Sequence, residues 1–264
     1  MIRACIFDLG GTIVDRYSLT PFLSLKKAFL KNNLYIRDEL IYKDMGISKS
    51  EHIRRITNDP EVKHQFFELE CSDIRERDRL FIYNDFNEIQ KRAASEINII
   101  PETKDIIDYL RNKDILIGVT TGFNKEITNI IHDRLDNEGI YIDKYVSSTC
   151  LDAPSRPYPF MINHIMDEFK IDESYNVIKL DDTVIGLEEG RAAHCWTAGV
   201  SRWSTNMMVK SLDESYSLTC DEIKEKNKIS RNILKKGRPH YILDTLNDLP
   251  EVLDILGMKV KISI

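Results

Sequence analysis

Five short apolar runs, separated by segments with helical periodicity, constrain the fold of this chain more than any other feature of its sequence. Each run is rich in β-branched residues and has the length of one buried strand. Strands that alternate with helices form βαβ units, which build a parallel sheet covered on both faces. The sequence therefore predicts an α/β fold with a Rossmann-like parallel sheet. The predicted strands are Ile2–Phe7, Ile115–Thr120, Asp143–Ser147, Asn176–Leu180 and Cys195–Val200, and the helices between the later ones are Thr103–Lys113, Lys125–Asn137, Tyr158–Phe169 and Leu187–Ala193.

The interval between the first and second strands is much the longest, and nothing in it is typical of a strand. It is densely charged and has helical periodicity, so we expect an α-helical insert over residues 17–95. Residues 1–16 and 96–264 then form the core. Active sites of parallel sheets lie at the carboxyl ends of the strands, which the insert would cover. The predicted helices of the insert are Phe22–Asn32, Lys49–Thr57, Glu61–Glu68 and Asp73–Lys91.

Composition narrows the class of partner. The 264 residues include 37 Lys and Arg against 43 Asp and Glu, a formal net charge of −6, which argues against a protein that coats nucleic acid. The five cysteines show no metal-binding spacing, and their odd number leaves one without an intramolecular partner. No apolar run approaches the length of a membrane span. We expect a cytoplasmic protein that acts on a small molecule, without nucleic acid or membrane as a partner.

The first predicted strand ends in Asp8, followed by Gly10, Gly11 and Thr12. A carboxylate at this place can attack phosphorus or hold a divalent cation. The glycines allow the backbone to approach a tetrahedral anion closely, and the threonine offers a hydroxyl. An ordinary turn between a strand and a helix explains these residues equally well when they are taken alone.

Further polar residues follow the other predicted strands. Thr121 and Gly122 follow the second and are suited to a phosphate oxygen, and Asp181 and Asp182 follow the fourth and are suited to Mg²⁺. Arg156 lies between them in the sequence and is suited to clamp a phosphoryl group. Because these strand ends meet at one edge of a parallel sheet, we expect the residues to form one site.

In the order and type of these residues the sequence resembles the haloacid dehalogenase superfamily of aspartyl phosphotransferases, and within it the phosphonatase family. The resemblance covers nearly the whole chain, and its most specific part lies in the insert. The motifs that carry it are Asp8 to Thr12, Met45-Gly46 with Lys49 and His52, Thr121-Gly122, Arg156-Pro157, Asp182-Thr183 and Glu189-Gly190-Arg191.

The resemblance implies a core of the haloacid dehalogenase type with a helical cap, and it implies roles for residues of the core. Asp8 would be the nucleophile that forms an aspartyl phosphate. Thr121 and Arg156 would bind the phosphoryl oxygens. Mg²⁺ would be held by Asp8, the backbone carbonyl of Gly10, and Asp182.

The resemblance also implies roles in the insert and an activity. Lys49 would form a Schiff base with phosphonoacetaldehyde, His52 would assist proton transfers, and Met45 would pack beside the amine. The reaction is hydrolysis of the C–P bond to acetaldehyde and phosphate. An imine is needed because cleavage otherwise expels a carbanion, a very poor leaving group, and a neutral amine is needed to form it. The family further implies a homodimer formed through the caps.

Four positions depart from the family. Gly186 replaces a second carboxylate of the metal site, and Asp181 stands where the family usually has glycine, from which it could compensate as a metal ligand. Phe123 replaces a tyrosine, and Ser18 replaces a cysteine. Two alternatives therefore stay open: a related hydrolase for another small phosphonate or phosphate ester, and a silenced protein that binds without turnover. A dinucleotide-binding protein is disfavoured because no GxGxxG follows the first strand.

Overall fold

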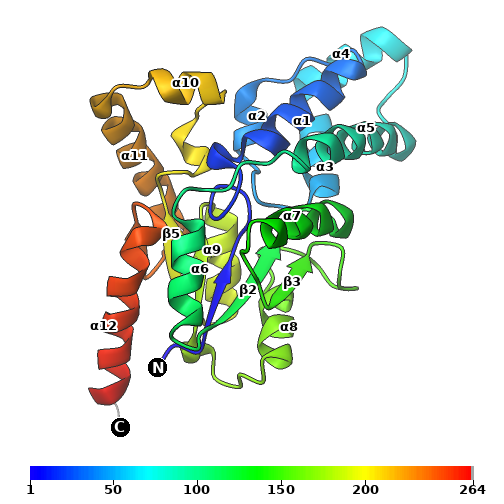
Figure 1. Cartoon of the computed structure of the whole chain (residues 1–264). Helices are drawn as coiled ribbons and strands as arrows, with labels where there is room; N and C mark the ends of the chain where they lie inside the picture. The colour runs from blue at the N-terminus through cyan, green and yellow to red at the C-terminus, as the bar shows by residue number, and fades with distance from the viewer. Residues whose placement is uncertain (263–264) are drawn as a thin grey trace.

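The computed structural model describes residues 1–262, and in that range six parallel strands form one sheet in the order β3-β2-β1-β4-β5-β6 (Figure 1). The N-terminal strand lies near the middle, between the second and fourth strands of the chain. The predicted α/β fold with a parallel sheet is confirmed. The strands are β1 (Ala4–Phe7), β2 (Leu116–Thr121), β3 (Lys144–Ser147), β4 (Val177–Asp181), β5 (Trp196–Val200) and β6 (Tyr241–Leu243).

Alternating side chains of the strands pack into two hydrophobic clusters, one on each face of the sheet. Cys5 and Phe7 of β1 lie in one cluster with side chains from α6, α7 and α12. Ala4 and Ile6, which point the other way because side chains alternate along a strand, pack with α8. Apolar contact on both faces explains why the strands read as continuous apolar runs. These helices are α6 (Thr103–Arg111), α7 (Lys125–Asn137), α8 (Phe160–Glu168) and α12 (Leu249–Ile262).

The boundaries of some elements differ from the prediction. The helix expected at Leu187–Ala193 is α9 (Val184–Ala192), which begins earlier because the Thr183 hydroxyl accepts a hydrogen bond from the Gly186 N–H and caps it. The strand β6 was not predicted, since three residues are too short to show a pattern. The segment before it contains α11 (Cys220–Leu234), preceded by α10 (Leu212–Ser217).

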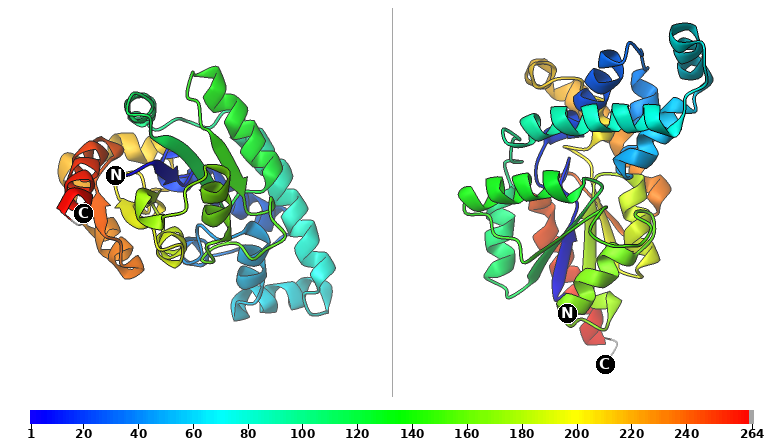
Figure 2. Two further views of the ribbon diagram at one scale, coloured as in Figure 1. Left: turned by 90° about the horizontal axis from the view of Figure 1, so that it is seen from below. Right: turned by 90° about the vertical axis from the view of Figure 1, so that its right-hand side faces the viewer.

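Five consecutive helices between β1 and β2 form a helical layer, the name used below for α1 to α5. The layer has a hydrophobic cluster of its own, built around Phe22, Phe29, Ile53 and Phe86. It lies at the end of the sheet opposite the N-terminus of the chain, over the carboxyl ends of the strands (Figures 1 and 2). The helices are α1 (Leu19–Lys31), α2 (Asp38–Tyr42), α3 (Lys49–Thr57), α4 (Pro60–Glu70) and α5 (Glu76–Ala94).

The two segments that join the helical layer to the sheet run side by side. The Asp15 N–H donates to the Asn98 carbonyl (2.7 Å), and the Arg16 N–H donates to the Asn98 side chain (3.1 Å). Asp15, Tyr17 and Ser18 adopt left-handed backbone conformations, which turn the chain sharply from the core into α1. The layer is thus attached through one narrow pair of connections.

The described part of the chain contains no disulfide bond among the cysteines: all five are free. Among residues 1–262, none of the helices combines the length and the apolar character that crossing a bilayer requires.

Candidate active site

A small cavity of about 30 Å³ lies between the carboxyl edge of the sheet and the helical layer. Its walls come from the turn after β1, the loops after β2 and β4, and the segment that leads into α3. Ser18 and Phe123, two of the positions that depart from the family, also line it. The cavity thereby joins most of the predicted site residues, namely Asp8, Gly10, Met45, Lys49, Thr121, Gly122, Arg156 and Asp182.

Four predicted residues do not line this cavity. Gly11 lies beside it, with a φ of +73°, and a Cβ there would come within 2.3 Å of an Asp182 oxygen. The Gly11 N–H donates to the Val14 carbonyl (2.8 Å), so this glycine supplies space and a tight turn. Thr12 is buried in the same turn. The remaining two, Asp181 and His52, lie behind the cavity wall and are described below.

Three buried carboxylates gather at the sheet edge: oxygens of Asp8, Asp181 and Asp182 lie within 4.8 Å of one another. Burial raises the pKa of Asp8 to about 6, although Arg156 acts in the opposite direction. Burial and the neighbouring carboxylates raise the pKa of Asp182 well above its usual range. Asp182 Oδ1 has no hydrogen-bond partner in the part of the chain that the structure describes. Crowded carboxylate oxygens, among them the Asp182 oxygen without a hydrogen-bond partner, suit a hard divalent cation as ligands.

Asp181 occupies the space that a side chain at position 186 would need. A Cβ on Gly186 would lie 1.9 Å from Asp181 Oδ2, so the two positions cannot both carry a carboxylate in this arrangement. Burial alone would raise the pKa of Asp181, but Lys179 (3.0 Å) and Arg156 (3.4 Å) outweigh it and hold the pKa below its usual value. The glycine at 186 and the aspartate at 181 are therefore sterically linked.

Arg156 is held by a buried polar network. Its Nη2 lies 2.8 Å from Asp8 Oδ1, and its Nε donates to Glu189 Oε2 (2.8 Å). The Thr120 hydroxyl also donates to Glu189 Oε2 (3.0 Å) and accepts from Lys179 Nζ (2.9 Å). Arg156 Nη1 has no partner within residues 1–262 and remains available as a donor. The network fixes the guanidinium beside Asp8 from two sides.

Sequence reasoning assigned no role to three members of this network: Thr120, Lys179 and Glu189. Lys179 carried a signal, because it is the one charged residue of the predicted strand Asn176–Leu180 and has apolar residues on both sides. Its side chain is fully buried, and a buried ammonium requires partners. Glu189 belongs to the motif Glu189-Gly190-Arg191, but its contact with Arg156 joins residues 33 positions apart and is visible only in the fold.

Lys49 enters the cavity from the first turn of α3, on the helical layer. Its side chain is buried, with 6% of the residue exposed. Burial lowers the pKa of the Lys49 amine to about 8, although Asp8 acts in the opposite direction. A larger share of the amine is therefore neutral near pH 7 than for an exposed lysine.

His52 lies one turn after Lys49 and is fully buried. Burial and the nearby Lys49 ammonium lower the His52 pKa well below its usual value, while the carbonyls of Leu40 and Ile41 act in the opposite direction. The imidazole is thus neutral near pH 7.

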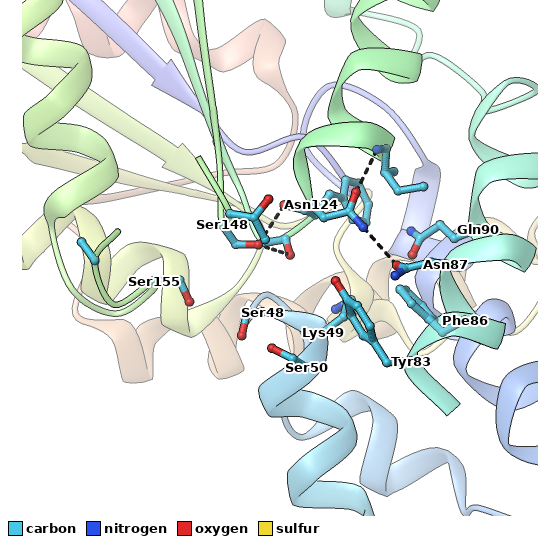
Figure 3. A pocket seen from close by; sticks show the side chains of 15 residues that line it. Ser48, Lys49, Ser50, Tyr83, Phe86, Asn87, Gln90, Asn124, Ser148 and Ser155 are labelled. Carbon is cyan, nitrogen blue, oxygen red and sulfur yellow. Dashed lines mark hydrogen bonds between the residues drawn. The ribbon is translucent and has the colours of Figure 1, made fainter. Parts of the chain in front are cut away.

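A second, larger cavity of about 210 Å³ lies on the other side of Lys49, and we call it the chamber. It is bounded by α5, by the start of α3 and by loops of the core (Figure 3). Lys49, Gly122 and Phe123 line both the chamber and the small cavity. Lys49 therefore lies where the two cavities meet.

Comparisons with known proteins agree with this architecture. A family model described as haloacid dehalogenase-like hydrolase matches residues 5–200. Phosphonoacetaldehyde hydrolase of Latilactobacillus sakei subsp. sakei is 32% identical over 96% of this chain and 95% of its own length. The protein of the same name from Bordetella pertussis is also 32% identical, over 96% of this chain and 91% of its own length. A crystal structure of a phosphonoacetaldehyde hydrolase-like protein from Oleispira antarctica superimposes with a TM-score of 0.92 at 27% identity, covering 98% of this chain and 93% of the other.

Proposed function

The chain belongs to the haloacid dehalogenase-like hydrolases and, within them, to the phosphonoacetaldehyde hydrolases; from this membership we propose that it hydrolyses phosphonoacetaldehyde to acetaldehyde and phosphate. The observation that carries the proposal is the small cavity, where Asp8 of the core and Lys49 of the helical layer line the same space. Asp8 is suited to attack phosphorus, and Lys49 is suited to attack a carbonyl carbon. A substrate whose phosphorus is bonded to the carbon next to a carbonyl carbon matches this pair of residues.

In this mechanism Asp8 attacks phosphorus and forms an aspartyl phosphate, which water then hydrolyses. The Arg156 guanidinium, which Glu189 and Thr120 hold beside Asp8, binds the phosphoryl oxygens through its unpartnered Nη1. Fixed positive charge beside the nucleophile stabilises the charge that develops on the transferred group. The Thr121 hydroxyl and the backbone at Gly122 bind the remaining oxygens, with Gly11 and Thr12 shaping the turn beneath.

Lys49 supplies the electron sink. Its neutral amine attacks the aldehyde, water leaves, and an imine forms. The imine nitrogen takes up a proton, and when the C–P bond breaks its electron pair moves into this iminium and gives a neutral enamine in place of a carbanion. His52 accepts and returns protons in these steps, and Met45 packs beside the amine. Protonation and hydrolysis of the enamine then release acetaldehyde and the free lysine.

Mg²⁺ is the proposed cofactor, held by Asp8, Asp182, the Gly10 carbonyl and, in place of a carboxylate at position 186, Asp181. When bound, the cation supplies charge that offsets the crowded carboxylates and the phosphoryl oxygens. The unpartnered Asp182 oxygen and the raised pKa of Asp182 support this assignment.

Residues 17–95 act as a cap domain that closes over the substrate and excludes water until the enamine is protonated. A homodimer formed through this cap is proposed as well, and four exposed apolar side chains support it: Phe67, Leu69, Leu80 and Phe81 on α4 and α5. The cytoplasmic location stays a prediction.

Reductive trapping tests the proposal directly. Borohydride added during turnover of phosphonoacetaldehyde should leave a two-carbon adduct on Lys49, located by peptide mass mapping. Lys43→Arg is the matched control, because Lys43 is exposed and lies outside the small cavity, and it should be trapped like the native chain. An active enzyme that yields no adduct on Lys49 would exclude the imine route.

A further inference from the structure

The chamber is the larger of the two cavities at Lys49. It shares Lys49, Gly122 and Phe123 with the small cavity, whereas Asp8 lines the small cavity and not the chamber. Its volume of 210 Å³ is about seven times the ~30 Å³ that one water molecule takes up in the liquid. A group of several non-hydrogen atoms therefore fits beside the lysine amine.

Gln90 of α5 is the unusual residue of the chamber wall. Only 1% of it is exposed, and neither its amide nitrogen nor its amide oxygen has a hydrogen-bond partner among the described residues. Its polar neighbours differ in this respect: the Asn124 amide donates to Asn87 Oδ1 (3.0 Å), and the Ser148 hydroxyl donates to the Phe123 carbonyl (2.9 Å), as Figure 3 shows. Burial of an unpaired amide destabilises a fold. A ligand that forms hydrogen bonds with the Gln90 amide would offset this cost and explain why the position carries a glutamine.

The charge of the wall narrows the kind of ligand. Of the described residues that line the chamber, Lys49 is the one that carries a charge. The wall otherwise presents amides, hydroxyls and the rings of Tyr83 and Phe86. An amide both donates and accepts hydrogen bonds, so it suits a neutral hydroxyl better than a carboxylate or an ammonium.

We propose that the chamber is a substituent pocket, through which the enzyme accepts ketone phosphonates whose carbonyl carbon carries a small hydroxylated group paired with Gln90. This inference rests on the proposed function and deepens it by naming a wider substrate class. The geometry follows from the position of Lys49: with phosphorus near Asp8 and the carbonyl carbon at the amine, the second substituent of that carbon points into the chamber. In phosphonoacetaldehyde this substituent is a hydrogen atom.

The chemistry is the same as for the aldehyde. The Lys49 amine and the ketone form a ketimine and release water. The ketimine nitrogen takes up a proton, and cleavage then transfers the phosphoryl group to Asp8 while the C–P electron pair forms a neutral enamine, which gains a proton on carbon. One water hydrolyses the resulting imine to a methyl ketone and free Lys49, and a second hydrolyses the aspartyl phosphate. The net reaction consumes one water and yields a methyl ketone and phosphate.

The experiment compares three substrates on the native holoenzyme with Mg²⁺: phosphonoacetaldehyde, acetonylphosphonate and hydroxyacetonylphosphonate. The native enzyme should favour the hydroxylated ketone over the plain ketone by about tenfold or more in kcat/KM, the scale set by one well-placed buried hydrogen bond. Gln90→Leu should abolish that preference and leave kcat/KM for phosphonoacetaldehyde nearly unchanged. It should also melt no lower than the native chain, because it removes an unpaired buried amide.

Gln65→Leu is the matched control: it removes the other glutamine of the helical layer, outside the chamber, and should keep the preference. Borohydride trapping of each substrate on Lys49 separates the possible failures. Hydrolysis and trapping of phosphonoacetaldehyde without either ketone, or an equal loss on all three substrates in Gln90→Leu, would overturn the substituent pocket while the proposed function stands. Failure with all three substrates would overturn both.

Discussion

At the scale of single residues, the Lys49 amine must lose its proton before it can attack a carbonyl. Burial lowers its pKa from 10.5 to about 8, so the protonated form prevails below pH 8 and the neutral form above it. We predict that kcat/KM for phosphonoacetaldehyde rises with pH and levels off above about pH 8. A pH–rate profile measures this limb. A limb that continues to rise up to pH 10 would show that burial does not tune this lysine.

Glu189 touches no substrate in this account, but it holds Arg156 in place. We predict that Glu189→Gln, which keeps the shape and removes the charge, lowers kcat/KM about 10- to 100-fold, the usual effect of losing a hydrogen-bonded support. The variant should raise KM for the phosphonate, because in the proposed mechanism Arg156 binds its oxygens. Glu188→Gln changes the adjacent residue, which lies outside the network, and should behave like the native enzyme. Equal effects of both substitutions would contradict a positioning role.

The pair Asp181 and Gly186 gives a prediction about stability and metal binding. Gly186→Asp alone places a side chain against the Asp181 carboxylate and should destabilise the fold by about 1–3 kcal/mol, as overpacking does. The double variant Asp181→Gly with Gly186→Asp moves the carboxylate instead of adding one. It should recover most of the melting temperature and bind Mg²⁺ in calorimetry. A single Gly186→Asp variant with unchanged stability would show that the two positions are independent.

At the scale of elements, the loop that leads into α3 meets the loop after β2 through backbone atoms. A Cβ on Gly122 would lie 2.8 Å from the Gly46 carbonyl oxygen and 2.9 Å from that of Ile47. We predict that Gly122→Ala pushes the helical layer away from the sheet and lowers kcat/KM by about 100-fold, because small displacements of reacting groups are costly. Gly257→Ala, at a glycine with open space around it, is the control and should have no effect.

The prediction from the sequence included most of the elements with strong patterns, but it omitted α12, a helix of 14 residues, as well as the shortest elements. The five longer strands and the helix Lys125–Asn137 follow from apolar runs and helical periodicity, and the structure contains them with small shifts at the ends. The strand β6 and the helix α2 are too short to show a period, and their positions depend on tertiary contacts.

The sequence predicted that Asp8, Thr121 and Asp182 lie close together, because each stands at or just after the carboxyl end of a predicted strand. Contacts between distant parts of the chain were not predictable, because they depend on side-chain directions that only the fold determines. Lys179 with Thr120, and the steric link between Asp181 and Gly186, are examples.

At the scale of the whole molecule, the hydrophobic cluster of the helical layer is separate from the two clusters on the faces of the sheet, and this separation explains why the site lies where it does. The helical layer packs around its own apolar residues, and the sheet packs around others. The polar residues left between the two bodies form the small cavity and the chamber. Because Asp8 belongs to one body and Lys49 to the other, the proposed mechanism requires both to close on the substrate.

In the proposed mechanism, both halves of this divided site act on one substrate. The most direct measurement is acetaldehyde release from phosphonoacetaldehyde, with Mg²⁺ and with a chelator, by the native chain, Asp8→Asn and Lys49→Arg, each checked by circular dichroism for its fold. We predict release by the native chain that requires Mg²⁺ and is lost in both variants. A folded native chain without release, or a Lys49→Arg variant that still cleaves the C–P bond at the native rate, would contradict the account.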